Sequence, residues 1–291
     1  MLTVMVTEAG GPAAVGLIKS LRKYSSDIQI LAVDADPSAS GIHISDHGHT
    51  VPYASDEQYI DKILSLIKKY SVNLILPTGE HDLYKLSENK KRLESLGCYI
   101  FISDKEAIET CQNKFKFYQA LKHTDIPVPM TFRNKMIVKP NRGSGSRGIE
   151  VLDLEKKVIQ EYLPGREYTV DVFCNMSSQI VNHVIRERLA TKAGISTKGR
   201  VVLNEEISSI IKRMVEHLSL KGPVCIQLKE DEAGNPFVIE CNPRLGGGTY
   251  ICTLAGVNYA ELYINILQKR DNVFRLPQEI TVVRYFEEVV L

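Results

Sequence analysis

Three side chains that could bind a metal ion, and an arginine that could bind a phosphate, lie close together in the last third of the sequence. Glu240 and Asn242 alternate with apolar residues, Gln227 lies in the preceding apolar stretch, and Arg244 follows Asn242 by two positions. Carboxylate and amide oxygens suit Mg²⁺ that is also bound by the phosphates of a nucleotide. An arginine guanidinium matches a phosphate in shape and charge. For each residue alone, the alternative is a polar residue on a solvated strand face.

The segments that must position these side chains are two strands. Residues 224–229 and 236–241 are short apolar stretches on either side of the turn-forming sequence Asp-Glu-Ala-Gly-Asn, which indicates an antiparallel hairpin. Because strand side chains alternate between faces, we expect Gln227, Glu240 and Asn242 to share one face. The opposite, apolar face is expected to hold Val224, Ile226, Leu228, Phe237, Ile239 and Cys241.

A second group with binding potential is a glycine- and serine-rich loop in the middle of the chain. Lys139 ends the apolar segment that precedes this loop. The loop contains Gly143, Ser144, Gly145, Ser146 and Gly148. Glycines allow successive backbone N–H groups to point at one anion, and serine hydroxyls add donors. The lysine precedes the glycines, so this is not a Walker A loop. The alternative is a flexible surface hairpin.

Taken in order, these motifs resemble the ATP-grasp superfamily, whose core ends in a metal-binding strand of the form E-x-N-P-R. Here that pattern runs from Glu240 to Arg244. The sequence is similar to single-copy enzymes related to the carbamoyl-phosphate synthetase large chain, and the resemblance covers most of the chain. It implies that residues 139–148 form a flap over the β- and γ-phosphates of ATP. It also implies that Mg²⁺, or Mn²⁺ in its place, is bound by Gln227, Glu240 and Asn242.

The resemblance assigns further residues to the nucleotide. In the family, a lysine at the position of Lys114 reaches the phosphates. Backbone groups near Glu161 and Leu163 are expected to pair with the adenine edge, and Glu167 with the ribose hydroxyls. Such a slot must be apolar, with main-chain donors and acceptors at its back. The complete nucleotide-binding set that the resemblance implies is Lys114, Lys139, Gly143, Ser144, Gly145, Ser146, Gly148, Gln160, Glu161, Leu163 and Glu167.

The catalytic residues implied by the resemblance are two arginines and a lysine. Arg186 resembles the arginine that holds the transferred phosphoryl group or an acyl phosphate, and Arg244 and Lys139 complete the set. Phosphoryl transfer depends on positioning and on neutralising charge, which these side chains can supply. Lys198 could contribute from a basic loop. For Lys198 and Arg188 the alternative is a surface cation.

The sequence departs from the family pattern in two ways. Asn113 replaces the aspartate that usually precedes the first lysine. The intervals from Lys114 to Lys139 and from Lys139 to Glu161 are also short. We therefore expect the lid lobe, about 123–160, to be a minimal sheet that lacks at least one helix. Such a lid shields the phosphates less completely, and exclusion of water is part of how these transfers avoid hydrolysis.

The first part of the chain, residues 1–110, alternates strand-like and helical segments. Strands are expected at 2–6, 28–33, 49–53, 74–78 and 99–103, and helices at 14–24 and 58–70. This order predicts an α/β protein whose N-terminal domain is Rossmann-like, with a parallel sheet and helices on its faces. Residues 111–291 would then form an ATP-grasp domain with an antiparallel C-terminal sheet. A last strand is expected within 280–286.

Two features of the N-terminal domain could concern ligands. Gly10, Gly11 and Gly16 follow the first strand and Asp34 follows the second, as in dinucleotide-binding domains, although the spacing is not G-x-G-x-x-G. Such a turn also serves to start a helix close to a strand. Glu80 lies at the carboxyl end of a strand, where α/β sheets bind ligands, and is a candidate for the acceptor site. Its alternative role is to cap a helix.

Composition narrows the classes of function. The chain is 44% hydrophobic and 24% charged, and its net charge is +1. These values are typical of a globular protein and give no electrostatic reason to expect nucleic acid or an anionic membrane as a partner. The first residues do not follow a signal-peptide pattern. Six cysteines without a C-x-x-C pair favour a reduced, cytoplasmic protein.

Together these observations predict a Mg²⁺- and ATP-dependent ligase that activates a carboxylate as an acyl phosphate and passes it to an amine. The expected partners are a small carboxylic acid and an amine, and a homodimer is a further expectation. Three alternatives stay open. They are a kinase that releases the phosphorylated acid or carbamate, an ATP-binding regulatory subunit without turnover, and a nicotinamide-dependent oxidoreductase. The last leaves residues 139–148 and 227–244 unexplained.

Overall fold

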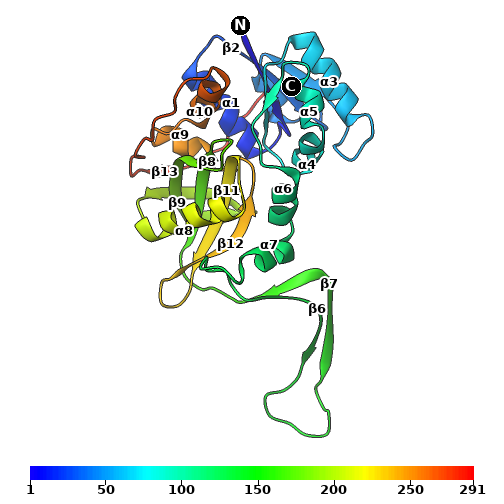
Figure 1. Cartoon of the computed structure of the whole chain (residues 1–291), viewed down its shortest axis with the longest axis vertical. Coiled ribbons are helices and arrows are strands. Elements are labelled where there is room, and N and C mark those ends of the chain that lie inside the picture. Colours follow the sequence, from blue (N-terminus) through cyan, green and yellow to red (C-terminus); the bar gives the residue numbers. More distant parts are fainter.

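The computed structural model describes residues 1–291 and contains two sheets with their helices and one long hairpin (Figure 1). A five-stranded sheet forms in the N-terminal part and a six-stranded sheet in the C-terminal part. The strands β6 and β7 form a separate two-stranded ribbon. None of the helices combines the length and the apolar character that crossing a bilayer requires. The α/β class expected from the sequence is confirmed.

The N-terminal sheet is parallel, in the order β3-β2-β1-β4-β5. Its strands are β1 (Leu2–Thr7), β2 (Ile28–Asp34), β3 (His47–Thr50), β4 (Leu74–Pro77) and β5 (Tyr99–Ile100). The helices of this part are α1 (Pro12–Tyr24), α2 (Ser40–Ile44), α3 (Tyr59–Tyr70), α4 (His81–Glu88), α5 (Lys90–Glu94) and α6 (Lys105–Gln112). The third and fifth strands are therefore shorter than the apolar stretches predicted for them.

Strand alternation divides the N-terminal side chains between two cores. Val4 and Val6 enter one core, whereas Met5 enters the core on the other face of the sheet. The first core continues into the C-terminal part, where the ring of Phe173 packs edge-on against that of Tyr263, with centroids 4.8 Å apart. The two parts of the chain consequently share one hydrophobic core.

The C-terminal sheet is antiparallel, in the order β12-β11-β8-β9-β10-β13. Its strands are β8 (Glu167–Cys174), β9 (Ile180–Lys192), β10 (Ile195–Val202), β11 (Gly222–Glu230), β12 (Pro236–Asn242) and β13 (Thr281–Val283). The helices of this part are α7 (Lys114–Leu121), α8 (Glu205–His217), α9 (Tyr250–Leu254) and α10 (Tyr259–Leu267). The closing strand falls within the predicted range but covers only three residues.

One face of this sheet is apolar and is covered by α8. Asn204 caps the helix, because its side chain accepts a hydrogen bond from the N–H of Ile207 at 3.0 Å. Five buried side chains form the packing stripe of the helix, namely Ile207, Ile210, Ile211, Met214 and Val215. The opposite face of the sheet carries charged and amide side chains and turns towards the N-terminal part.

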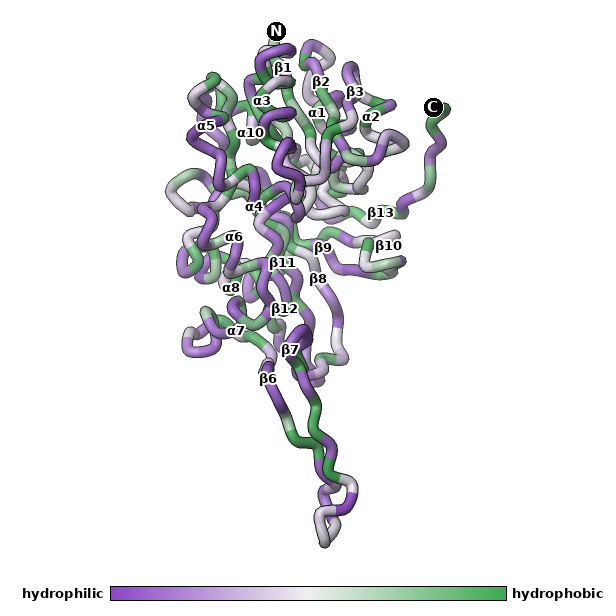
Figure 2. The backbone as a smooth tube through the Cα atoms, turned by 90° about the vertical axis from the view of Figure 1, so that its right-hand side faces the viewer, coloured by the Kyte–Doolittle hydropathy of each residue, from purple (hydrophilic) through white to green (hydrophobic).

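The lid is a bare hairpin of β6 (Thr131–Val138) and β7 (Glu150–Gln160), which projects from the body as an arm (Figure 1). Figure 2 shows the same projection from the side. Pairing along the arm is irregular, because Phe132 pairs with Ile159 but Asn134 pairs with Leu154. One residue of β6 thus faces four residues of β7. As expected from the short spacing, this segment has two strands and no helix between α7 and β8.

The helix α8 provides a test of this packing. We expect Ile211→Ala to lower the free energy of unfolding by about 2–5 kcal/mol, because a buried side chain is removed and a cavity is left. Lys212→Ala, on the exposed side of the same helix, should change it by no more than about 0.5 kcal/mol. Urea denaturation followed by circular dichroism measures both values. Equal effects of the two substitutions would contradict the assigned packing face.

Candidate functional site

A pocket of about 1110 Å³ lies between the N-terminal and C-terminal sheets. One wall is formed by the carboxyl ends of β1, β2 and β4, with Glu8, Asp34 and Glu80 among its residues. This is the edge at which open parallel sheets bind ligands. The other wall is the polar face of the C-terminal sheet, which includes Arg186 and Arg188.

The register of β11 and β12 sets the polar side chains of the second wall. Gln227 lies opposite Glu240, and Cys225 lies opposite Asn242. Directly opposite residues of an antiparallel pair share a face, so the three predicted metal ligands lie on one face, as expected. Asn242 is buried and Glu240 is half-buried.

The apolar face of this hairpin differs from the prediction. A β-bulge follows the pair of Gln227 and Glu240, so that Leu228 pairs with Val238 and Ile239 is the extra residue. Val238 and Cys241 therefore enter the core, whereas Phe237 and Ile239 are only partly buried. Strict alternation placed Phe237 and Ile239 in the core, and this was wrong because the bulge shifts the period by one residue.

A lysine lies next to the metal-ligand candidates. Lys114 begins α7, and its Nζ lies 3.3 Å from Oε1 of Glu240. Asn113 caps this helix by accepting hydrogen bonds from the N–H groups of Phe115 and Lys116, at 3.2 and 3.0 Å. An asparagine thus performs the capping that an aspartate would perform here. The structure brings the lysine and the carboxylate together although 126 positions separate them.

Arg188 connects two predicted ligand-binding residues. Its Nη1 donates to Glu167 and, at 3.2 Å, to Oε1 of Gln227, while its Nη2 donates to the carbonyl of Gly194 at 2.6 Å. Its side chain is only 6% exposed, so it is not a surface cation. Sequence reasoning did not select this residue. Arg188 lies two positions after Arg186, and this spacing places both arginines on the same face of β9.

Arg186 forms the most buried ion pair of the site. Its side chain and that of Asp171 are each 2% exposed, and Nε of Arg186 lies 2.6 Å from Oδ2 of Asp171. Burial disfavours the charge, but the carboxylate outweighs this and raises the pKa of Arg186. The guanidinium lies against the glycine segment before α9, since a Cβ on Gly248 would be 2.4 Å from Nη1. Gly248 is therefore required for the backbone to pass this arginine, whereas a Cβ on Gly246 would meet Sγ of Cys225 at 2.6 Å.

The two walls of the pocket meet at an ion pair. Nη2 of Arg244 donates to Oε1 of Glu80, which lies just before α4. Glu80 does not cap that helix. Instead Oε1 of Glu8 accepts hydrogen bonds from the N–H groups of His81 and Asp82, at 2.9 and 3.1 Å. Glu8 thus performs the capping role that the sequence gave as an alternative for Glu80.

The predicted adenine hinge lies at the base of the arm. Leu163 is buried. The N–H of Glu161 donates to the carbonyl of Met130 at 2.9 Å, and its carboxylate accepts from the N–H of Met130 at 3.1 Å. Gln160 donates from Nε2 to the hydroxyl of Thr131 at 3.0 Å. These contacts hold the hinge segment against the start of β6.

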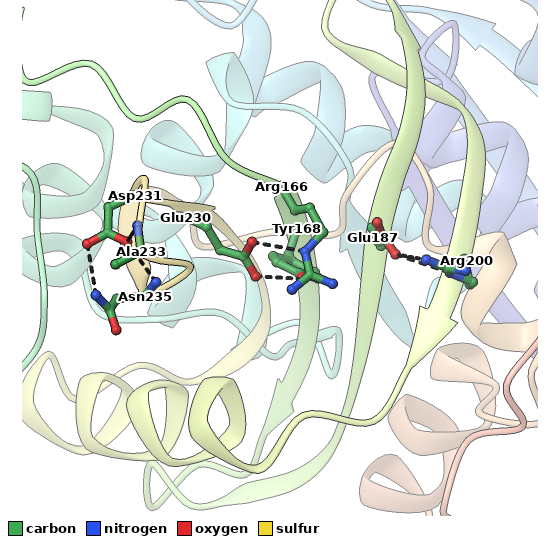
Figure 3. Close-up of polar contacts among 8 residues, drawn as sticks. All are labelled: Arg166, Tyr168, Glu187, Arg200, Glu230, Asp231, Ala233 and Asn235. Atoms are coloured by element: carbon green, nitrogen blue, oxygen red, sulfur yellow. Dashed lines mark hydrogen bonds and ion pairs between the residues drawn. The ribbon is translucent and has the colours of Figure 1, made fainter.

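A buried carboxylate fastens the turn between the hinge and β8 (Figure 3). Oε2 of Glu230 accepts from Nε of Arg166 at 2.9 Å, and Oε1 accepts from the hydroxyl of Tyr168 at 2.8 Å. The carbonyl of Glu230 accepts from the N–H of Gly165 at 2.9 Å. A Cβ on Gly165 would lie 2.6 Å from Cβ of Glu230, so only glycine fits. This network fixes the entry to β8, which begins at the predicted ribose ligand Glu167.

The predicted phosphate flap lies elsewhere. Lys139 and the glycine loop are exposed in the connection between β6 and β7. This connection forms the tip of the arm, which points away from the two larger sheets (Figures 1 and 2). Gly145 and Gly148 have φ values of +69° and +74°, as a tight loop requires. The structure does not bring this loop to Lys114 or to the polar face. Lys198 is exposed on β10.

The hairpin face offers three side-chain oxygen donors for Mg²⁺. One carboxylate and two amide oxygens share a strand face, and the oxygen of Gln227 already accepts from Arg188. No group of three or more His, Cys, Asp or Glu side chains is arranged as a metal cage. A single carboxylate with amide oxygens fits Mg²⁺ that takes its other ligands from phosphates and water.

The buried ion pair provides a second prediction. We expect Asp171→Asn to lower the free energy of unfolding by about 3–5 kcal/mol, because Arg186 then stays buried without its counter-charge. Asp61→Asn, in the exposed ion pair with Arg92, should cost less than about 1 kcal/mol. Thermal and urea unfolding measure both. A loss below about 1 kcal/mol for Asp171→Asn would show that the pair does not hold this wall together.

Comparison with known families divides the chain into two matching segments. Residues 153–289 match a family described as ATP-grasp in the biosynthetic pathway with Ter operon. Residues 5–101 match a family described as PylC-like, N-terminal domain. No curated protein matches the sequence.

Solved structures share the fold at low sequence identity. The biotin carboxylase domain dimer of Hydrogenobacter thermophilus 2-oxoglutarate carboxylase is 15% identical, with a TM-score of 0.66 over 95% of this chain and 71% of that one. N5-carboxyaminoimidazole ribonucleotide synthetase from Thermotoga maritima is 18% identical, with a TM-score of 0.63 over 95% of this chain and 78% of that one. The L-amino acid ligase from Bacillus licheniformis is 18% identical, with a TM-score of 0.63 over 92% of this chain and 74% of that one. Residues 153–289 thus match an ATP-grasp family, and the chain as a whole is similar in fold to these ATP-grasp structures.

Proposed function

We propose that this protein uses Mg²⁺ and ATP to activate a carboxylate as an acyl phosphate, which an amine then attacks. The observation that carries the proposal is the polar face of the C-terminal sheet. Gln227, Glu240 and Asn242 share that face, and Lys114 lies 3.3 Å from Glu240. Because the same face continues into the pocket, a nucleotide bound there would have its phosphates next to the space for the other substrates.

Each part of the nucleotide has candidate residues. Leu163 and the hinge segment would contact adenine, and Glu167 would accept hydrogen bonds from ribose. Lys114 would offset the phosphate charge. Glu240 and Asn242, with Gln227, would hold Mg²⁺, which when bound neutralises phosphate charge during transfer. The resemblance in fold to a carboxylase domain solved with MgADP supports this arrangement.

The chemistry proposed has two steps. A carboxylate oxygen of the acid attacks the γ-phosphorus of ATP, and the bond from that phosphorus to the β,γ-bridging oxygen breaks to release ADP. The amine nitrogen then attacks the acyl carbon, the bond to the phosphate oxygen breaks, and the nitrogen loses a proton. Arg186 and Arg244 line the pocket and would offset the charge on the transferred group. The protein itself forms no covalent bond in this scheme.

The arm must move for the flap to take part. Its irregular pairing between Phe132–Ile159 and Asn134–Leu154 provides a place to bend, and Asn134 has a φ of +75° there. We propose that bending at this point carries Lys139 and the glycine loop towards the phosphates. The exposed position of the loop also favours a second candidate function, an ATP-binding regulatory subunit without turnover. The homodimer expected from the sequence stays a prediction.

The metal carboxylate gives a direct test of the ligase proposal. We expect Glu240→Gln to reduce Mg²⁺-dependent ADP release by about 100-fold or more, because the only carboxylate of the metal set is lost. Glu232→Gln, in the exposed turn of the same hairpin, is the matched control. ADP release is measured over a panel of carboxylic acids and amines, and circular dichroism checks the fold. Unchanged release in Glu240→Gln would mean that the metal is held elsewhere.

The arm gives a test that separates the two candidate functions. We expect Lys139→Ala to reduce acid-dependent ADP release by about 100-fold, because a phosphate counter-charge is lost during transfer. Lys135→Ala removes another exposed lysine of the same arm and should have little effect. If ATP binds but no acid stimulates ADP release even in the unmodified protein, the regulatory function is favoured. Equal rates in the two lysine variants would exclude the tip of the arm from the reaction.

A further inference from the structure

A pair of carboxyl groups on the N-terminal wall of the pocket has no counter-ion. Glu8 follows β1, and Asp82 lies in the first turn of α4. Oε1 of Glu8 accepts the N–H of Asp82 at 3.1 Å, which holds the two residues together. Both residues line the pocket, and Asp82 is only 1% exposed.

The hydrogen-bonding capacity of this pair is incomplete. Oδ1 of Asp82 is buried and has no hydrogen-bond partner, and the same holds for the hydroxyl of Thr7, which also lines the pocket. The contact to the other carboxylate oxygen, from the hydroxyl of Tyr59, is long at 3.4 Å. No Lys, Arg or His lies within ion-pairing distance of either carboxyl group. A buried carboxyl group such as that of Asp82 is costly to ionise without a cation, so the site beside the half-buried Glu8 is suited to receive one.

The other acidic groups of this wall are already used. Asp34 accepts hydrogen bonds from the N–H groups of Gly10 at 2.7 Å and Asp36 at 2.9 Å. Glu80 is paired with Arg244. The carboxyl groups that remain for a ligand are therefore those of Glu8 and Asp82.

The facing wall carries three arginines, each of which is paired with a carboxylate. Arg186, Arg188 and Arg244 all line the pocket from the C-terminal part. The Nε groups of Arg188 and Arg244 are buried and have no hydrogen-bond partner, so donors are left over on this wall. One pocket thus combines a carboxyl end with spare acceptor capacity and an arginine end with spare donor capacity. A ligand with a positive group at one end and a carboxylate at the other would satisfy both.

We propose that Glu8 and Asp82 form a binding subsite for an ammonium group, and that one substrate is an amino acid whose carboxylate faces the three arginines. The inference rests on the proposed function, because it names the substrate class of the same pocket. Glu8 and Asp82 act here by binding and orienting the substrate. The length of the amino acid is set by the separation of the two walls.

Binding of an ammonium group at this subsite should be accompanied by release of a proton from Asp82. Burial and the charge of Glu8 raise the pKa of Asp82 to about 8. The groups facing Asp82 are Glu8 after β1, Thr7 on β1 and Tyr59 on α3. At pH 7, below that pKa, the free protein keeps the Asp82 carboxyl protonated. A bound ammonium group favours the ionised form, so binding should release a proton.

The experiment uses ω-amino acids as probes of length. Glycine, 3-aminopropanoate, 4-aminobutanoate and 6-aminohexanoate are titrated by calorimetry into the full chain, with Mg²⁺ and a non-hydrolysable ATP analogue, at pH 7. Buffers of different ionisation enthalpy report proton release. We expect at least one probe to bind with release of about one proton, and its N-acetyl derivative, which lacks the ammonium group, to bind at least 10-fold more weakly.

Variants of Glu8 and Asp82 then test whether these two residues cause the binding of the probe and the release of the proton. Asp82→Asn and, as a second variant, Glu8→Gln should each weaken the best probe at least 10-fold, and Asp82→Asn should abolish proton release. Glu88→Gln is the matched control, because Glu88 lines the same pocket but is paired with Lys105. Absence of binding by every probe, or equal binding of a probe and its N-acetyl derivative, would overturn the subsite. Unaltered affinity and proton release in both folded variants would overturn it as well.

The outcomes for the subsite and for the ligase are distinguishable. If other carboxylic acids stimulate ADP release that Glu240→Gln removes, while no ω-amino acid binds, the ligase stands and the subsite fails. If an ω-amino acid binds with proton release but no acid or amine stimulates ADP release, the subsite stands and the ligase fails.

Discussion

The buried ion pair between Arg186 and Asp171 is the constraint on which the rest of the site depends. Two charges in a nearly dry interior are tolerated only when their remaining hydrogen-bonding groups are satisfied. Here the second oxygen of Asp171 accepts from the hydroxyl of Thr249 at 2.8 Å, and its carbonyl accepts from the hydroxyl of Tyr259 at 2.6 Å. The pair therefore ties β8 and β9 to α9 and α10. Gly248, just before α9, has no side chain because its backbone passes directly over the guanidinium.

This arrangement explains how one sheet both packs against the rest of the protein and forms a wall of the pocket. Its apolar face is covered by α8, and one end of its other face packs with the N-terminal core through Phe173, Val184 and Val201. Only the part between that packed end and the free edge at β12 is left for polar side chains. These are the residues that form a wall of the pocket. The N-terminal sheet supplies the other wall from its carboxyl edge, where α/β sheets bind ligands.

The lid of this protein consists only of the hairpin of β6 and β7. An isolated two-stranded hairpin has little stability of its own, and several apolar side chains of the arm are exposed, among them Ile137 at 65% and Val151 at 60%. The arm carries the glycine loop, yet it makes its contacts with the body only at its base, near Met130 and Glu161. The body of the protein is thus well packed, whereas the part that would cover the phosphates is connected through one irregular ladder.

Features that depend on local pattern were determined by the sequence itself. Strand alternation placed Gln227, Glu240 and Asn242 on one face, the short spacing between motifs indicated a lid without a helix, and the alternation of elements gave the parallel sheet. Contacts between distant segments were decided only by the tertiary structure. Neither the bulge at Ile239 nor the pairing of Glu80 with Arg244 can be inferred from periodicity, because both depend on how separate elements pack. The same reason applies to the burial of Arg188, the capping of α4 by Glu8 and the direction of the arm, since local spacing does not specify which residues meet in space.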